Sequence, residues 1–191
     1  NIIKFKRIMS IIGITGSIAS GKTTVANLMA GKKYPLFSAD KIVLNLYKKK
    51  SFIIALIKKF KLNKNKKIKD QIKLILKKNK KNLYILETLI HPLVRKKMKI
   101  FLNKKNKLLF LEIPLLIESK LSKYFDEVIF VDAKKKTRLR RYIKRGGNKK
   151  IFSLLDSRQL SPVIKKKMCD YTINNNYSLE ILKKTVKNFI K

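Results

Sequence analysis

The stretch GITGSIASGKTT, residues 13–24, decides the fold of this chain. It overlaps a short apolar, β-branched run that begins at Ser10, and it leads into residues 23–30, which are compatible with a helix. Gly16 to Thr23 match the pattern G-x-x-x-x-G-K-[ST], and the order strand, glycine loop, helix is that of a phosphate-binding loop. The glycines let successive backbone N–H groups converge on a phosphate, and the helix adds its positive N-terminal end.

Two side chains at the end of this motif carry phosphate chemistry. In such a loop the Lys22 ammonium bridges the β- and γ-phosphates of a nucleoside triphosphate, and the Thr23 hydroxyl holds Mg²⁺. The alternative is a glycine turn with an incidental lysine, but a chain with only 6 glycines rarely matches the pattern by chance. We therefore predict that the loop holds a nucleoside triphosphate.

The composition fits one compact domain with an unusual charge. The chain has 191 residues, and its 49 Lys and Arg against 11 Asp and Glu give a net charge of +38. Basic residues are spread along nearly every helix-like segment, and Lys, Ile and Asn, which A/T-rich codons encode, are elevated together. We interpret the charge as coding bias and expect no specific nucleic-acid partner, although non-specific attraction to polyanions follows from the field.

The sequence indicates a reduced, cytoplasmic setting and no membrane segment. Cys169 is the single cysteine, so an internal disulfide is impossible, and no apolar run approaches the ~18 residues of a membrane span. The start NIIKFKRI lacks the apolar region and cleavage site of a secretory signal. From the position of Met9 we expect residues 1–8 to be an extension upstream of the natural start.

Further short apolar runs predict the other strands of a parallel sheet. Helical patterns separate these runs, which are Leu36–Phe37, Leu108–Ile113, Val128–Val131 and Tyr171–Ile173. The chain is therefore predicted to be α/β, with a parallel five-stranded sheet.

Two stretches depart from a simple alternation of strand and helix. Residues 42–102 show amphipathic helical patterns and no convincing strand, which predicts a helical insertion between the second and third strands. Residues 137–167 are rich in Arg and Lys and contain adjacent glycines, which is typical of a mobile helical hairpin with a hinge. A closing helix is expected over 178–190, with Ser178 as its N-cap.

Asp40 is the candidate for work on a phosphate acceptor. The second strand is expected to end in Phe37-Ser38-Ala39-Asp40, and a carboxylate there faces the crevice of an open α/β sheet. It would accept a proton from an attacking hydroxyl group. The residues leave open the alternative that Asp40 caps a helix starting near Ile42.

Several elements, taken in order, resemble the dephospho-CoA kinase family. They are GSIASGKTT, the S-A-D that ends at Asp40, L-E-x-x-x-H-P at Leu86–Pro92, E-I-P-L-L-I-E at Glu112–Glu118, R-R-x-x-x-R at Arg140–Arg145, and D-Y-T-I-N-N at Asp170–Asn175. The resemblance covers roughly residues 10–190, and among its elements only the loop is specific by itself.

The resemblance implies a three-layer P-loop kinase with three parts. These are a core (9–41, 103–136 and 168–191), a helical CoA-binding insertion (42–102) and a lid (137–167). The implied reaction transfers the γ-phosphate of ATP, in the presence of Mg²⁺, to the ribose 3′-hydroxyl of dephospho-CoA, which is the last step of CoA synthesis.

The resemblance also implies roles for single residues. Asp40 is the implied base for the 3′-hydroxyl, and Lys22 and the lid residue Arg141 are the other catalytic groups. The implied ATP-binding residues are Ala19, Ser20, Gly21, Lys22, Thr23, Thr24, Arg145 and Asn175. The implied residues of the acceptor side are Asp40, His91, Arg95, Leu115 and Leu116.

Simpler roles remain open for some of these side chains. His91, which precedes Pro92 at the expected start of an amphipathic helix, would serve equally as a capping or packing group. Glu118 would equally cap or pair locally. Most of the predicted lid arginines are expected to be solvated surface: Arg138, Arg140, Arg141 and Arg145.

Some positions depart from the family pattern. Ser38 stands where aspartate is usual, and Glu112 replaces a shorter Asp, which would shift a magnesium-bound water. Lys69 stands where arginine is usual, which weakens the case for a bidentate phosphate contact there. Ser17 and Ala19 replace loop glycines, and Ala19 tolerates fewer backbone angles than glycine does.

Two other functions remain as alternatives. Another small P-loop kinase, acting on a nucleoside or nucleotide, would share the loop, and a basic nucleic-acid-binding NTPase would share both the loop and the charge. We expect a monomer that binds ATP and dephospho-CoA, and the sequence leaves an oligomer open.

Overall fold

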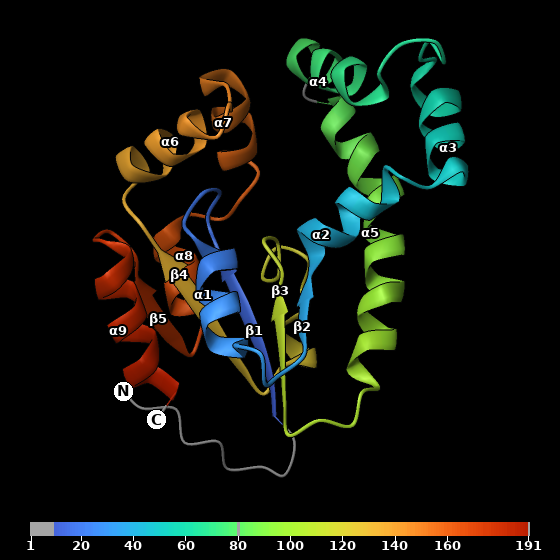
Figure 1. The fold of residues 1–191 in the computed structure, drawn as a ribbon. Helices are drawn as coiled ribbons and strands as arrows, with labels where there is room; N and C mark the ends of the chain where they lie inside the picture. Colours follow the sequence, from blue (N-terminus) through green and yellow to red (C-terminus); the bar gives the residue numbers. More distant parts are fainter. Residues whose placement is uncertain (1–9, 80, 191) are drawn as a thin grey trace. The chain divides into compact units, whose positions relative to one another are not determined.

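A parallel five-stranded sheet forms the centre of the fold in a computed structural model that describes residues 10–79 and 81–190 (Figure 1). Its strands are β1 (Ser10–Gly16), β2 (Leu36–Ser38), β3 (Leu108–Glu112), β4 (Glu127–Asp132) and β5 (Tyr171–Asn174). They stand in the order β2-β3-β1-β4-β5, and every neighbouring pair is parallel. The predicted α/β class and sheet are therefore confirmed, whereas the predicted extension at 1–8 lies outside the described residues.

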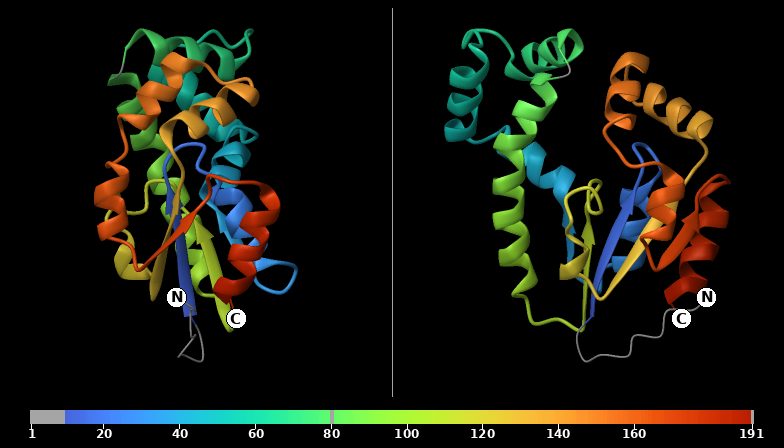
Figure 2. Two further views of the ribbon diagram at one scale, coloured as in Figure 1. Left: turned by 90° about the vertical axis from the view of Figure 1, so that its left-hand side faces the viewer. Right: turned by 180° about the vertical axis from the view of Figure 1, so that it is seen from behind.

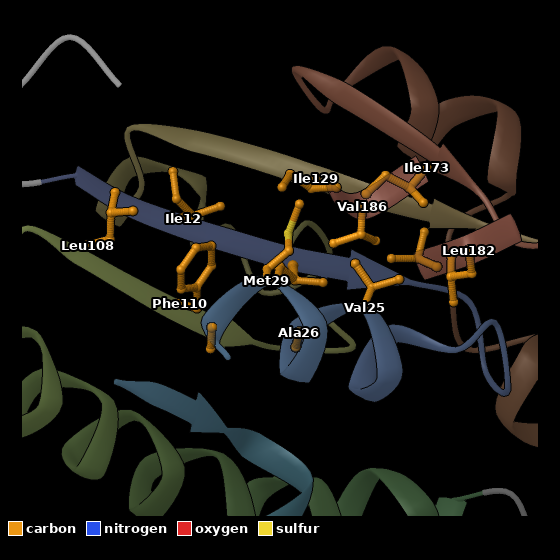
Figure 3. Packing of buried hydrophobic residues seen from close by; sticks show 13 residues of the cluster. Ile12, Val25, Ala26, Met29, Leu108, Phe110, Ile129, Ile173, Leu182 and Val186 are labelled. Carbon is orange, nitrogen blue, oxygen red and sulfur yellow. The ribbon is translucent and has the colours of Figure 1, made fainter. Parts of the chain in front are cut away.

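The core lies between the sheet and two helices, α1 (Lys22–Ala30) and α9 (Leu179–Ile190). Alternate side chains of the strands, such as Ile12 and Ile129, face these helices, because successive residues of a strand point to opposite sides of the sheet. Figure 3 shows Val25 and Met29 of α1 beside Val186 of α9 in this layer. The packing fixes the start of α1 relative to the end of β1.

Three further helices follow the fourth strand: α6 (Lys135–Lys144), α7 (Lys149–Asp156) and α8 (Pro162–Lys167). A 3₁₀ turn, η1 (Ser122–Tyr124), precedes that strand. Viewed along the sheet edge, α8 lies on one side of the sheet and α1 and α9 lie on the other (Figure 2). The sheet is thus covered on both faces, as parallel sheets generally are.

Residues Ala39–Ile100 form a second compact unit with its own core, and the rest of the described chain forms the first unit. The second unit contains α2 (Ala39–Leu46), α3 (Lys50–Phe60), α4 (Ile68–Lys78) and most of α5 (Lys81–Leu102). Its buried side chains include Phe52, Leu56 and Leu86. The structure is helical across this region, as the sequence predicts, and the assignment of a CoA-binding insertion and a lid stays a prediction.

Two local expectations were wrong. The strand β2 ends at Ser38, and α2 begins at Ala39 rather than near Ile42, so Asp40 lies in the first turn of a helix. His91 does not stand at a helix start, because α5 runs continuously through Pro92. Proline lacks the N–H that would bond back along the helix and usually breaks it, but a helix held by packing on its other turns can accept one.

No helix of the described residues is long and apolar enough to span a membrane.

Candidate active site

The glycine loop joins β1 to α1, and at two of its glycines the neighbouring atoms leave no room for a Cβ atom. A Cβ atom on Gly16 would lie 2.6 Å from the carbonyl oxygen of Val131, and one on Gly21 would collide with Asn175 Nδ2. Gly21 also has a φ of 98° at the N-cap of α1, a left-handed conformation that glycine adopts at little cost. The loop backbone therefore passes close to the ends of β4 and β5, in the tight turn that the motif predicts.

Ala19 occupies a turn position that favours glycine. The Ser20 N–H donates to the Ser17 carbonyl oxygen at 3.1 Å and closes a turn over Ile18 and Ala19. The φ of Ala19 is 58°, where the Cβ atom of an L-residue crowds the backbone. The conflict expected from the missing glycine is therefore present in the structure.

Replacing Ala19 by glycine is expected to stabilise the fold. The left-handed conformation costs alanine roughly 1–2 kcal/mol, while the extra freedom of glycine in the unfolded chain offsets about 0.4–1 kcal/mol. We expect a rise in Tm of about 1–4 °C, measured by thermal melting. The control is Lys120→Gly, which relieves a left-handed residue outside the loop (φ 54°). A rise for Lys120→Gly without one for Ala19→Gly would contradict strain at Ala19.

Lys22, Thr23 and Thr24 are the first residues of α1. Lys22 is 7% exposed, and its Nζ donates to the Ser17 carbonyl oxygen at 3.0 Å. The ammonium group thus reaches back across the loop that its own helix follows. This is the side of the helix start on which a bound phosphate gains from both the backbone N–H groups and the helix dipole.

The Thr23 hydroxyl is held by Glu112, the last residue of β3, whose side chain is fully buried. It donates to Glu112 Oε1 at 2.5 Å, and the Ser38 hydroxyl donates to Oε2 at 2.8 Å. Glu112 was not among the site residues expected from the sequence, although it begins the E-I-P-L-L-I-E element and was linked there to a magnesium-bound water. An acid at the carboxyl end of a buried strand beside a phosphate loop was the signal that would have placed it there.

Arg141 and Asn175 contact each other beside the loop. Asn175 Nδ2 donates to the Ser20 carbonyl oxygen at 2.8 Å, and an Arg141 guanidinium nitrogen donates to the Asn175 carbonyl oxygen at 3.0 Å. Burial, and then the neighbouring Arg145 and Arg140, lower the pKa of Arg141 from its ordinary value. Arg141 therefore belongs to the loop's surroundings, whereas Arg145 is exposed at the C-terminal end of α6.

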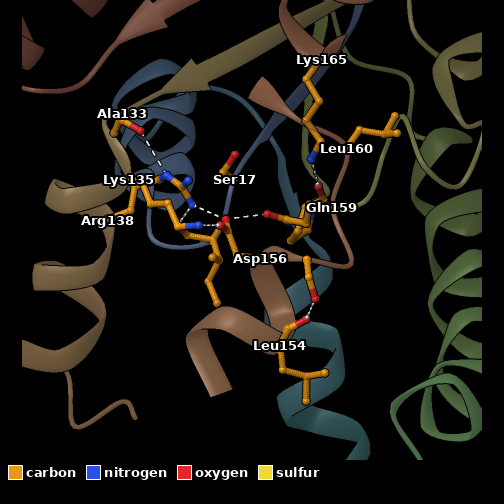
Figure 4. Close-up of polar contacts among 12 residues, drawn as sticks. Ser17, Ala133, Lys135, Arg138, Leu154, Asp156, Gln159, Leu160 and Lys165 are labelled. Carbon is orange, nitrogen blue, oxygen red and sulfur yellow. Dashed lines mark hydrogen bonds and ion pairs between the residues drawn. The ribbon is translucent and has the colours of Figure 1, made fainter. Parts of the chain in front are cut away.

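Arg138 is buried, which makes it an exception among the predicted lid arginines, most of which were expected to be solvated. Figure 4 shows its guanidinium group beside Asp156. One guanidinium nitrogen donates to Asp156 Oδ1 at 2.6 Å and to the Ile18 carbonyl oxygen at 3.3 Å. Gln159, which follows α7, accepts a hydrogen bond from the Ile18 N–H at 2.8 Å. The sequence did not distinguish these residues, because their partners are far away along the chain.

The E-I-P-L-L-I-E element after β3 is held by a buried ion pair. Glu118 Oε1 lies 2.7 Å from Nζ of Lys165, whose side chain is fully buried, and it also accepts a hydrogen bond from the Leu160 N–H. The sequence left open that Glu118 forms a pair instead of contacting a substrate, and the structure pairs it with Lys165. Leu116 is fully buried beside Gly13, so in this structure it belongs to the core, and only the half-buried Leu115 is left of the two leucines assigned to the acceptor side.

The remaining acceptor-side residues lie in the second unit. Asp40 is exposed in the first turn of α2. His91 and Arg95 stand four positions apart on α5 and therefore share one helix face, with His91 half-buried and Arg95 exposed. The Lys69 ammonium lies 5.5 Å from the centre of the Tyr47 ring, a cation–π contact within that unit.

Comparison with known proteins finds relatives that match nearly the whole chain. The family model described as dephospho-CoA kinase matches residues 10–180. The dephospho-CoA kinase of Fusobacterium nucleatum is 37% identical over 94% of this chain and 96% of its own length. The solved structure of dephospho-CoA kinase from Campylobacter jejuni superposes with a TM-score of 0.63 at 29% identity and 93% coverage of each chain. A crystal structure from Thermus thermophilus gives a TM-score of 0.75 at 29% identity, over 95% of this chain and 96% of that one. The family match spans most of the chain and includes the glycine loop and Glu112, so the chain belongs to the dephospho-CoA kinase family.

Proposed function

We propose that this chain transfers the γ-phosphate of ATP to the ribose 3′-hydroxyl of dephospho-CoA and releases CoA and ADP. The observation that carries the proposal is the loop itself, with Lys22 reaching back across it and Thr23 paired to Glu112, in a member of this family. The test is ADP release with ATP and dephospho-CoA, compared with ADP release with nucleosides and nucleoside monophosphates. Turnover of the latter alone would favour another small P-loop kinase.

The donor side of the reaction is assigned to the loop and α6. Phosphoryl transfer depends mainly on positioning and on stabilisation of charge, so backbone N–H groups, Lys22 and Arg141 are suited to hold the triphosphate. Arg141 already contacts the Ser20 and Asn175 carbonyl oxygens beside the loop, which limits the motion needed to meet a nucleotide. Asn175 borders the same place and is assigned to the adenine side of ATP.

The magnesium ion is assigned to Thr23, with Glu112 behind it. A hydroxyl and a carboxylate are the oxygen ligands that Mg²⁺ prefers, and Mg²⁺ usually keeps several waters and binds substrate phosphates as well. The donor set therefore fits an ion that arrives with the nucleotide, where it would neutralise charge on the transferring group.

Replacing Thr23 by valine is expected to raise the Mg²⁺ concentration needed for half-maximal activity. The expected increase is at least about 10–100-fold, because loss of a group behind a metal ligand already weakens metal binding on that scale and Thr23 is the assigned ligand itself. The measurement is a Mg²⁺ titration at saturating ATP. Thr23→Ser keeps the hydroxyl that Glu112 Oε1 accepts from and serves as the control. Equal Mg²⁺ requirements for the two variants would remove Thr23 from the metal site.

The acceptor side is assigned to Asp40 as the base, with His91, Arg95 and Leu115 as binding groups. A carboxylate takes the proton of the attacking hydroxyl as the new bond to phosphorus forms. Asp40 is an exposed residue of the described structure and lies in the first turn of α2, directly after the carboxyl end of β2. The burial of Leu116 does not support its assignment to this side.

A basic nucleic-acid-binding NTPase is the alternative from another class, since the chain carries a net charge of +38. Salt distinguishes the two functions, because binding to a polyanion falls steeply with ionic strength. Kinase turnover that persists near physiological salt, together with loss of nucleic-acid binding there, supports the enzyme.

We also propose a cytoplasmic location and a monomeric state. Light scattering in solution tests the monomeric state.

A further inference from the structure

The peptide group on each side of Ile18 is held by a side chain from outside the loop. The Ile18 N–H donates to Gln159 Oε1 at 2.8 Å, and the Ile18 carbonyl oxygen accepts from Arg138 at 3.3 Å. The backbone N–H and the carbonyl oxygen of Ile18 are therefore both hydrogen-bonded to the segment from α6 to Gln159. We call Gln159 and Arg138 the Ile18 clamp.

The clamp is itself fixed in place. The Arg138 guanidinium is nearly buried, since its side chain is 3% exposed, and its Nε donates to the Ala133 carbonyl oxygen at 3.1 Å. Asp156 bonds Arg138 through one oxygen and lies 3.3 Å from Lys135 Nζ through the other (Figure 4). The Gln159 N–H donates to the Asp156 carbonyl oxygen, which ties the two halves of the clamp together.

The clamp acts on the peptide next to the strained residue of the loop. The Ile18 carbonyl belongs to the peptide that leads into Ala19, whose φ is 58°. Alanine in isolation prefers a negative φ, so a loop with alanine here would tend to leave the turn that the Ser20 N–H and the Ser17 carbonyl close. Hydrogen bonds on both sides of Ile18 oppose that departure, because it would reorient the peptide that they hold.

We propose that Gln159 and Arg138 are positioning residues, which hold the loop in its phosphate-binding conformation although glycine is missing at Ala19. The inference rests on the proposed binding of ATP at this loop. Neither residue is required to touch the nucleotide, and the effect on ATP passes through the Ile18 peptide. The consequence is an energetic coupling between Gln159 and Ala19, because the Gln159 side chain holds the peptide next to Ala19.

Gln159 is the residue to vary, because it is half-buried and its replacement leaves no charge unpaired. Gln159→Leu keeps the approximate size and removes the acceptor, whereas Gln159→Glu keeps an oxygen that accepts from the Ile18 N–H. The measurement is the Kd of Mg-ATP by titration calorimetry, without dephospho-CoA, for both variants in the native chain and in Ala19→Gly. Melting curves establish folding, and Gln159→Ala replaces Gln159→Leu should the latter fail to fold.

We expect Gln159→Leu to raise the Kd of ATP about tenfold in the native chain, and by less than about threefold in Ala19→Gly, where the left-handed turn is no longer costly. Gln159→Glu should stay within about threefold of the native Kd, since it retains the acceptor. In steady-state kinetics, the KM of Gln159→Leu for ATP should rise. Its kcat should stay within about twofold of the native value, because at saturating ATP the bound phosphates themselves fix the loop.

Two results would overturn the inference. One is a Kd that Gln159→Leu does not change, and the other is an equal change with alanine and with glycine at position 19, which would make the contact independent of the strain. The proposed function fails differently. A native chain that binds ATP but does not phosphorylate dephospho-CoA refutes that function and leaves the calorimetric test of the clamp intact.

Discussion

Replacing Lys22 by alanine should lower kcat for phosphate transfer by about 10²–10³-fold while leaving the fold intact. The loop backbone still offers its N–H groups to the β-phosphate, but the charge that follows the transferring group is lost. The side chain of Lys22 contributes a hydrogen bond to the Ser17 carbonyl oxygen, so a small loss of stability is expected as well. The measurement is kcat at saturating substrates together with a melting curve.

The control for this variant is Lys32→Ala, which removes the same charge from an exposed position just beyond α1. Its kcat should equal that of the native chain, because the general field of so basic a protein changes little with one lysine. Native turnover in a folded Lys22→Ala protein would show that the loop does not take part in the transfer.

The fold was predictable where local pattern and packing agree. The β-branched run before the glycine loop, and the short apolar runs such as Val128–Val131, were predicted to be buried strands, and the structure places them in one parallel sheet. The loop was predictable from the position of its glycines. The structure gives the physical reason, because a Cβ atom on Gly16 or Gly21 would collide with neighbouring atoms. The strain at Ala19 was also predictable, because the family that the sequence resembles usually has glycine at this position of the loop.

What escaped prediction depends on contacts between distant parts of the chain. Nothing near Arg138 marks it as buried, because its partners Asp156 and Ile18 come from other segments. Pro92 predicted a helix boundary, but α5 runs through it, so the packing of the helix outweighed the local signal. Leu116 has the same apolar character as Leu115, and only the fold shows that it is fully buried beside Gly13 of β1.

The second large effect is expected at Asp40, on which the proposed acceptor chemistry depends. Asp40→Asn keeps the shape of the side chain and removes its basicity, so kcat should fall by roughly 10²–10⁴-fold while the KM for ATP barely changes. Asp40 lies in the first turn of α2, where a negative charge also favours the helix dipole by about 0.3–1 kcal/mol. A small decrease in Tm is therefore expected along with the loss of activity.

Asp70→Asn separates these two contributions, because Asp70 likewise lies in the first turn of a helix, α4, and is an exposed carboxylate. Both variants lose a favourable charge at a helix start, so their melting temperatures should fall by similar amounts. Only Asp40→Asn should lose turnover. If Asp40 serves the helix alone, the two variants will behave alike in both measurements, and the proton of the 3′-hydroxyl must then leave by way of another group, with His91 the next residue to replace.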